Sequence, residues 1–175
     1  MNKGNYHKKI RDCKISDFLD NLSSKSPTPG GGAVAAIVGA MGASLVKMVC
    51  NLTIGKKNYA KVESSMQKVV FEADKYEKEL LILADCDVEA FDGVMQAYRS
   101  KDNESIRKAL EKAIEVPTRV KILAEKIEGL AIGVSKKGNK NAYSDALTAV
   151  YLSHAAIDSA DENIEINKKA LASLK

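Results

Sequence analysis

The sequence has little that would interrupt helices, because only three of its 175 residues are proline. Two of the three, Pro27 and Pro29, lie two positions apart, so nearly all of the remaining chain is free to be helical. No segment alternates apolar and polar residues as a half-buried strand does. These absences favour an all-α fold, and a chain of this length is expected to form a single domain over residues 1–175.

Aromatic residues are also scarce, since tryptophan is absent and aromatics make up 5% of the chain. The net charge is +4, and the basic residues are dispersed apart from Lys3, Lys8, Lys9 and Arg11. Nucleic-acid binding normally uses a basic face with aromatic or base-reading groups, so no nucleic-acid partner is expected. The basic cluster is expected to belong to a frayed, solvated start over residues 1–13.

The cysteines are too few and too irregularly spaced to suggest a disulfide framework or a metal site. Cys13, Cys50 and Cys86 are odd in number and form no CxxC or CxxH pattern, so neither disulfides nor a metal site is expected. No apolar segment follows the N-terminal charges as it would in a signal peptide. A reducing, cytoplasmic location is therefore expected.

The most unusual segment runs from Ser26 to Thr53 and carries no charge over residues 26–46. From Ala33 onward, bulky and small residues recur at helical spacing on opposite sides, and a helix that is apolar all round is a buried helix. A membrane span needs about 20 strongly apolar residues, and this segment is rich in Gly and Ala, so no membrane partner is expected. We predict a central buried small-residue helix whose small side packs against another helix or a second subunit. The bulky side comprises Val34, Ile37, Val38, Met41, Leu45, Met48 and Leu52, and the small side comprises Ala35, Ala36, Gly39, Gly42 and Ala43.

Apolar periodicity in the rest of the chain predicts an up-and-down helical bundle. A short helix over 17–22, capped by Ser16, precedes a non-helical stretch over 23–32. A long amphipathic helix ends near Ser100, and the next runs from about 105 to 136 with a kink or break at Pro117. A last helix begins near Ala142, after a turn rich in Gly and Asn.

One carboxylate of the long helix lies on its apolar side. At about 100° per residue, Asp87 falls roughly 20° from Leu80, inside the apolar stripe, whereas Asp85, Glu89 and Asp92 are expected to be solvated. A carboxylate in such a place must be paired, hydrogen-bonded or protonated, because burial raises its pKa. The same environment suits a general acid or base, so a structural and a catalytic role for Asp87 are equally open.

Two other features have simple structural explanations. Ser144 and Asp145 fall in the first turn of the last helix, where the helix dipole alone favours an acid. Backbone N–H groups at Gly30–Gly32 could hold an anion, but the sequence there is no phosphate-binding loop. A plain turn is the favoured interpretation of the glycines.

Three blocks of the sequence resemble the cyclodeaminase/cyclohydrolase family. They are PTPGGGAVAAIVGAMGASLVKMVCNLTIGKK, then LADCDVEAFDGVMQAY, then GNKNAYSDALTA with NIEIN further on, and the similarity covers roughly residues 16–167. The family comprises the cyclodeaminase domain of formiminotransferase-cyclodeaminase and stand-alone methenyltetrahydrofolate cyclohydrolases. The resemblance implies an all-α homodimer with a folate site built from helices, and no cofactor beyond the tetrahydrofolate substrate.

The resemblance also implies roles for particular residues. The family's proton-donating aspartate matches Asp87, the residue already singled out by its inward angle. Lys56 and Lys57 could meet the glutamate carboxylates of folate, although a solvated pair is the simpler interpretation. The residues implied to line the folate pocket are Gly30, Gly31, Gly32, Asn139, Asn141, Ser144 and Asp145.

The implied activity is hydrolysis of 5,10-methenyltetrahydrofolate or deamination of 5-formiminotetrahydrofolate, with Asp87 as general acid/base. The sequence departs from the family pattern at Arg99–Lys101, where Arg-Leu-Pro is usual, and at the polar segment 158–163. These departures leave a second hypothesis open, a folate-binding module or helical dimer scaffold without turnover.

Overall fold

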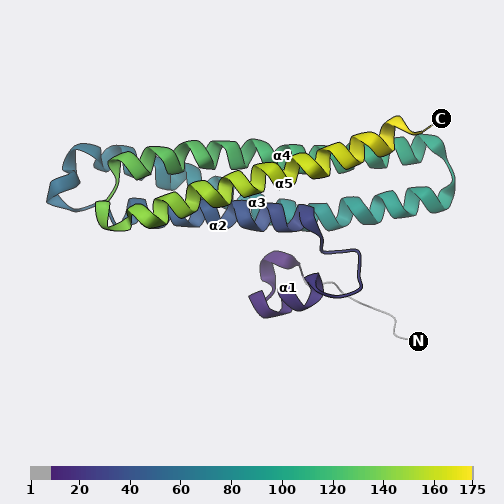
Figure 1. Ribbon diagram of the computed structural model, residues 1–175, viewed down its shortest axis with the longest axis horizontal. Helices are drawn as coiled ribbons and strands as arrows, with labels where there is room; N and C mark the ends of the chain where they lie inside the picture. The colour runs from purple at the N-terminus through teal and green to yellow at the C-terminus, as the bar shows by residue number, and fades with distance from the viewer. Residues whose placement is uncertain (1–8, 175) are drawn as a thin grey trace.

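The computed structural model describes residues 9–174, and every regular element in that range is helical. Four long helices lie side by side, each running back along the one before it (Figure 1). The predicted all-α, up-and-down bundle is therefore confirmed. The long helices are α2 (Gly31–Asn51), α3 (Glu63–Ser100), α4 (Asn103–Lys137) and α5 (Tyr143–Ala172), and the short ones are η1 (Ile10–Asp12), α1 (Ile15–Leu22), η2 (Lys57–Val62) and η3 (Lys140–Ala142).

The long helices are unequal in length, and this inequality shapes the molecule. Helix α2 has 21 residues, whereas α3 has 38, α4 has 35 and α5 has 30. At about 1.5 Å per residue, α2 spans roughly 31 Å and α3 roughly 57 Å. Helix α2 begins partway along the bundle (Figure 1), so beyond its first residue only three helices continue.

The small side of α2 faces the interior of the bundle, as predicted. A Cβ added to Gly39 would lie 3.2 Å from Leu80 Cδ1 of α3, and one added to Gly42 would lie 2.9 Å from Ser153 Oγ of α5. Ala36 and Ala43 are fully buried beside them. Small residues are needed at these positions because α3 and α5 approach the α2 backbone closely.

The bulky side of α2 faces outward, and the expectation that this helix is buried all round is wrong. Met41 is 52% exposed, and Met48 and Leu52 on the same side are also exposed. The reason is geometric, since placing the small side against α3 and α5 turns the opposite side away from them. The result is a row of large apolar side chains that no element of the described chain covers fully.

By length and composition alone, Gly31–Asn51 is the one described helix that could cross a membrane. A single helix of this kind is weak evidence, because the core helix of a soluble protein passes the same test. In this bundle its small side is covered by α3 and α5.

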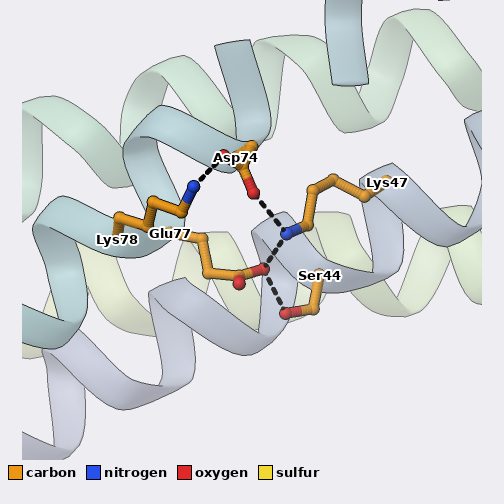
Figure 2. A network of polar contacts seen from close by, with 5 residues as sticks. All are labelled: Ser44, Lys47, Asp74, Glu77 and Lys78. Atoms are coloured by element: carbon orange, nitrogen blue, oxygen red, sulfur yellow. Dashed lines mark hydrogen bonds and ion pairs between the residues drawn. The ribbon is translucent and has the colours of Figure 1, made fainter. Parts of the chain in front are cut away.

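A polar network joins α2 to α3 beside this outward face (Figure 2). Lys47 Nζ lies 3.1 Å from Asp74 Oδ1 and 2.9 Å from Glu77 Oε2, while Ser44 Oγ donates to Glu77 at 2.6 Å. Lys78 reaches the other oxygen of Asp74 at 2.6 Å. Burial lowers the pKa of Lys47, but the hydrogen bonds and charges of Glu77 and Asp74 outweigh it and raise that pKa overall.

Helix α4 continues through Pro117, so of the predicted kink or break, the break does not occur. A proline has no N–H, so the carbonyl four residues earlier, at Ala113, loses its donor within the helix. Asn167 of α5 replaces that donor, because its Nδ2 lies 2.9 Å from Ala113 O. A side chain from the neighbouring helix thus satisfies the carbonyl that the proline leaves free.

The N-terminal segment is attached to α3, where a frayed, solvated start was expected. Residues 1–8 of that expectation lie outside the described residues, but the Ile10 backbone N–H donates to Asp85 Oδ1 at 2.7 Å. Arg11 Nε lies 3.6 Å from the other oxygen, and the Asp85 side chain is only 11% exposed. The prediction that Asp85 is solvated is therefore wrong, because η1 covers it; Glu89 and Asp92 are exposed as predicted. Helix α1 follows and lies beside the bundle rather than within it (Figure 1).

Candidate active site

A groove of about 320 Å³ lies where α2 begins. Because α2 begins only at Gly31, it does not cover the facing sides of the three longer helices beyond that point. Gly30, Gly31 and Gly32 close the head of the groove, and Leu110 and Ala113 of α4 also line it. Helix α3 contributes Asp87, Ala90, Phe91, Val94 and Tyr98, and α5 contributes Asn163, Ile166, Asn167 and Ala170.

Asp87 lies at the head of this groove, against the first turn of α2. A Cβ at Gly32 would overlap Asp87 Oδ1 and lie 2.6 Å from Asp87 Cγ, so only glycine leaves room for this carboxylate. The Ala33 backbone N–H is hydrogen-bonded to Asp87. The first N–H groups of a helix have no acceptor within it, and the residue that precedes α2, Gly30, offers no side chain. The Asp87 carboxylate therefore lies at the N-terminus of α2, beside N–H groups that have no acceptor within the helix.

Burial is the main influence on the ionisation of Asp87, and it raises the pKa of this carboxyl. The hydrogen bond from Ala33 acts in the opposite direction, and its effect is smaller. No cation in the described part of the chain pairs with Asp87. The inward orientation predicted from the helical angle is thus confirmed, and the carboxylate still faces an open groove, where it can meet a ligand.

The groove walls suit a flat ligand. Phe91 and Tyr98 lie on α3, Ile166 lies across from them on α5, and all three line the same space. Aromatic and aliphatic walls bury the faces of a planar ring, while a few polar groups fix its orientation. The groove therefore combines an apolar surface with a single acid at its head.

Six other residues implied to bind folate lie at the opposite end of α2. Lys56 and Lys57 follow the C-terminus of that helix, about 31 Å from its first residue by its length. The neighbouring turn is joined to this end by Asn139, whose backbone N–H donates to Thr53 Oγ1 at 2.8 Å. One chain therefore does not bring these residues to the Asp87 groove. They are Lys56, Lys57, Asn139, Asn141, Ser144 and Asp145.

At that end of α2, Asn139 stabilises the turn through hydrogen bonds. It is buried, its Nδ2 donates to Leu52 O at 2.9 Å, and its Oδ1 accepts from the Asn141 backbone N–H at 3.1 Å. Lys56, Lys57, Asn141 and Ser144 are exposed around it, and Asp145 is half-buried.

Two residues of the groove were not singled out from the sequence as site residues, Asn163 and Asn167. Both were present in the NIEIN block, but their side chains were not assigned a role. A usable signal was present, because they recur at a spacing of four on the side of α5 that also carries buried Ala156 and Ala160. Two amides on an otherwise apolar stripe need hydrogen-bond partners, just as an inward carboxylate does.

A groove with apolar walls and one sheltered carboxylate has the features of a small-molecule site, and comparison with known proteins identifies the family. The sequence model of the formiminotransferase-cyclodeaminase family matches residues 14–174, so the chain belongs to this family. The resemblance drawn from the three sequence blocks is thereby confirmed.

Individual relatives cover most of the chain. A methenyltetrahydrofolate cyclohydrolase of Methylorubrum extorquens is 45% identical over 166 residues, which are 90% of this chain and 80% of that protein. The mouse formimidoyltransferase-cyclodeaminase is 25% identical over 91% of this chain, which spans only 31% of the mouse protein. The crystal structure of a formiminotetrahydrofolate cyclodeaminase from Thermotoga maritima matches with a TM-score of 0.90 and 36% identity, covering 94% of this chain and 82% of that one.

Proposed function

We propose that this chain is a folate one-carbon enzyme in which Asp87 acts as the general acid/base. The observation that carries the proposal is the position of Asp87, which is half-buried, has a raised pKa and lies at the head of an apolar groove. Groups with perturbed pKa values in such places are suited to proton transfer near neutral pH. The names of the relatives supply the two candidate reactions.

The first reaction is hydrolysis of 5,10-methenyltetrahydrofolate. Water adds to the cationic carbon that bridges N5 and N10, and the Asp87 carboxylate stabilises the cation and takes one proton from the water. Asp87 then returns this proton to one of the two nitrogens as its bond to the carbon breaks. The hydroxyl proton leaves to solvent as the formyl carbonyl forms, so one proton is released overall.

The second reaction is deamination of 5-formiminotetrahydrofolate. In this reaction N10 attacks the formimino carbon, the N10 proton moves to the formimino nitrogen, and the bond from the carbon to that nitrogen then breaks as ammonia leaves and the methenyl cation forms. Protonated Asp87 donates to the departing nitrogen, which a raised pKa makes possible near neutral pH. The 45% identity to a cyclohydrolase favours the first reaction for this chain. A cytoplasmic location and the lack of a cofactor beyond tetrahydrofolate are parts of the same proposal.

The proposed enzyme is a homodimer that forms through the outward face of α2. Met41, Met48 and Leu52 lie on that face, and α1 borders it across an apolar hollow of about 480 Å³. Burying such a surface against a second copy removes it from water. In a two-fold dimer with antiparallel α2 helices, the far end of one helix lies beside the start of the other. Lys56 and Lys57 of one copy would then approach the Asp87 groove of the second copy.

The alternative is a folate-binding module or dimer scaffold without turnover, suggested by the polar segment 158–163. In the structure this segment is an ordinary part of α5, where Asp161 pairs with Lys121 of α4 at 2.8 Å and Asn163 lines the groove. The polar residues therefore do not disrupt the bundle, and the segment gives no reason to prefer the alternative.

Turnover and binding measurements separate these functions. The decay of methenyltetrahydrofolate absorbance, and the release of ammonia from 5-formiminotetrahydrofolate, are followed with and without protein. We expect the protein to accelerate the first reaction. Calorimetric binding of a reduced folate without any turnover would support the binding module, and no binding at all would remove folate from both hypotheses.

A further inference from the structure

The amide of Asn167 has a fixed orientation because of Pro117. A proline at 117 leaves the Ala113 carbonyl without a helical donor, and Asn167 Nδ2 donates to that carbonyl at 2.9 Å. A carbonyl accepts only from the nitrogen end of an amide, so the two ends of this side chain cannot be exchanged. The nitrogen end is engaged with α4, and the oxygen end remains available.

Asn163 repeats this arrangement one turn earlier on α5. Its Nδ2 donates to Ser159 O at 2.7 Å, which fixes its amide in the same way. Neither Asn163 Oδ1 nor Asn167 Oδ1 accepts a hydrogen bond from any other described residue. Both residues line the groove that Asp87 heads. The groove wall thus presents two neutral acceptors, four residues apart on one helix face and about 5–6 Å apart at their Cβ atoms.

This pair of acceptors favours a ligand whose edge carries hydrogen-bond donors. An anionic group such as a carboxylate or phosphate presents acceptors of its own and gains nothing from two amide oxygens. A ring edge that carries N–H donors is complementary to them, and its flat faces would contact Phe91 and Ile166. The fused pterin ring of a folate has such an edge, formed by its amino group and ring N–H groups.

We propose that Asn163 and Asn167 accept hydrogen bonds from the N–H donors of the substrate's pterin ring and thereby position its one-carbon bridge beside Asp87. This inference rests on the proposed function and adds two substrate-positioning residues to it. Asn163 is the one nearer the head of the groove, since its Nδ2 lies 3.7 Å from the place of a Cβ on Gly31. The ring is therefore held along α5, opposite the helix that carries the acid.

The test compares steady-state kinetics on 5,10-methenyltetrahydrofolate for the wild type, Asn163→Leu and Asn167→Leu. Leucine keeps the approximate volume but removes the acceptor. Asn163→Leu is the cleaner variant, because it loses only a bond to its own helix, whereas Asn167 also ties α5 to α4. Lys168→Leu is the control, an exposed polar residue of the same helix that does not line the groove.

We expect Asn163→Leu to raise KM by about tenfold, the effect of one lost hydrogen bond of about 1.4 kcal/mol, and also to lower kcat, because the one-carbon bridge is held less precisely beside Asp87. Its thermal midpoint and that of Lys168→Leu should stay near the wild-type value, and Lys168→Leu should keep the wild-type KM. An unchanged KM in folded Asn163→Leu, with an active wild type, would overturn this inference alone. A wild type without turnover or folate binding would overturn the proposed function, and this inference with it.

Discussion

The carboxylate of Asp87 occupies the space that a side chain at Gly32 would need. The two residues lie on different helices, and the contact is possible because α2 starts with glycines where α3 turns an acid inward. The requirement for glycine at this point is steric, since Gly32 is an ordinary helical residue. The triple glycine is therefore part of the site, beyond its role in ending the turn.

Gly32→Ala should abolish most activity without unfolding the protein. The new methyl group would displace the Asp87 carboxylate, and a misplacement of about 1 Å in a reacting group can cost about 100-fold in rate. Alanine gains about 1 kcal/mol in helix propensity, which offsets part of an overpacking cost of about 1–3 kcal/mol. Turnover of methenyltetrahydrofolate and urea unfolding measure the two effects separately.

The matched control is Gly31→Ala. A Cβ there would lie 3.7 Å from its nearest neighbour, Asn163 Nδ2, which is ordinary contact. We expect this variant to keep most of the wild-type kcat. Equal activity losses in the two variants would show that flexibility of the glycines, rather than room for Asp87, is what matters.

The raised pKa of Asp87 predicts a pH dependence of stability. Burial disfavours the charged carboxylate, so the folded protein holds this proton to a higher pH than the unfolded chain does. The contribution of this group is therefore fully present below the ordinary aspartate pKa of 3.8 and is lost as the pH rises through the raised value. Asp87→Asn lacks this titration.

The thermal midpoint of Asp87→Asn, relative to that of the wild type, should accordingly increase as the pH rises from about 4 towards neutrality. Unfolding followed by circular dichroism at several pH values measures the difference. If the difference instead decreased over this range, the α2 N-terminus would be lowering the pKa of Asp87, and the predicted direction of the shift would be wrong.

The sequence predicted those features of the site that are set within one helix, but not those that are set by contacts between distant segments. The inward angle of Asp87 follows from the periodicity of one helix, and it was found correctly. The burial of Asp85 depends on η1, which lies 75 residues away in sequence, so a helical angle alone could not show it. The continuity of α4 depends likewise on Asn167 reaching the carbonyl that Pro117 leaves free. In each case a contact between distant segments decided the outcome.

The two sides of α2 show the same limit. Its small and bulky sides were both visible in the sequence, and the small side was correctly predicted to pack against another helix, but the sequence did not show that the bulky side is left outward. The small side packs closely against Leu80 and Ser153, and the bulky side therefore faces outward. Because α2 is apolar on all sides, the sequence predicted that it is fully buried. In the single chain, one of its sides is exposed.

The outward side leads to a prediction about assembly. Met41→Glu should convert the proposed dimer to monomer, because a charge at the centre of an apolar contact must be desolvated without a partner. Sedimentation equilibrium gives the mass directly. Activity should fall with dissociation if the second copy contributes Lys56 and Lys57 to the groove.

The control for this variant is Ile132→Glu, which changes an exposed apolar residue of α4. It should leave the mass and the activity of the wild type unchanged. A wild type that sediments as a monomer at assay concentrations would refute the proposed dimer.

The most direct test of the central claim is the rate of methenyltetrahydrofolate hydrolysis by Asp87→Asn beside that of the wild type. The amide preserves the size of the side chain but cannot accept the water proton as a carboxylate does, so kcat should fall by about 100-fold or more. The variant should remain folded, since burial of the charge is relieved. A folded Asp87→Asn protein with the wild-type rate would contradict the account.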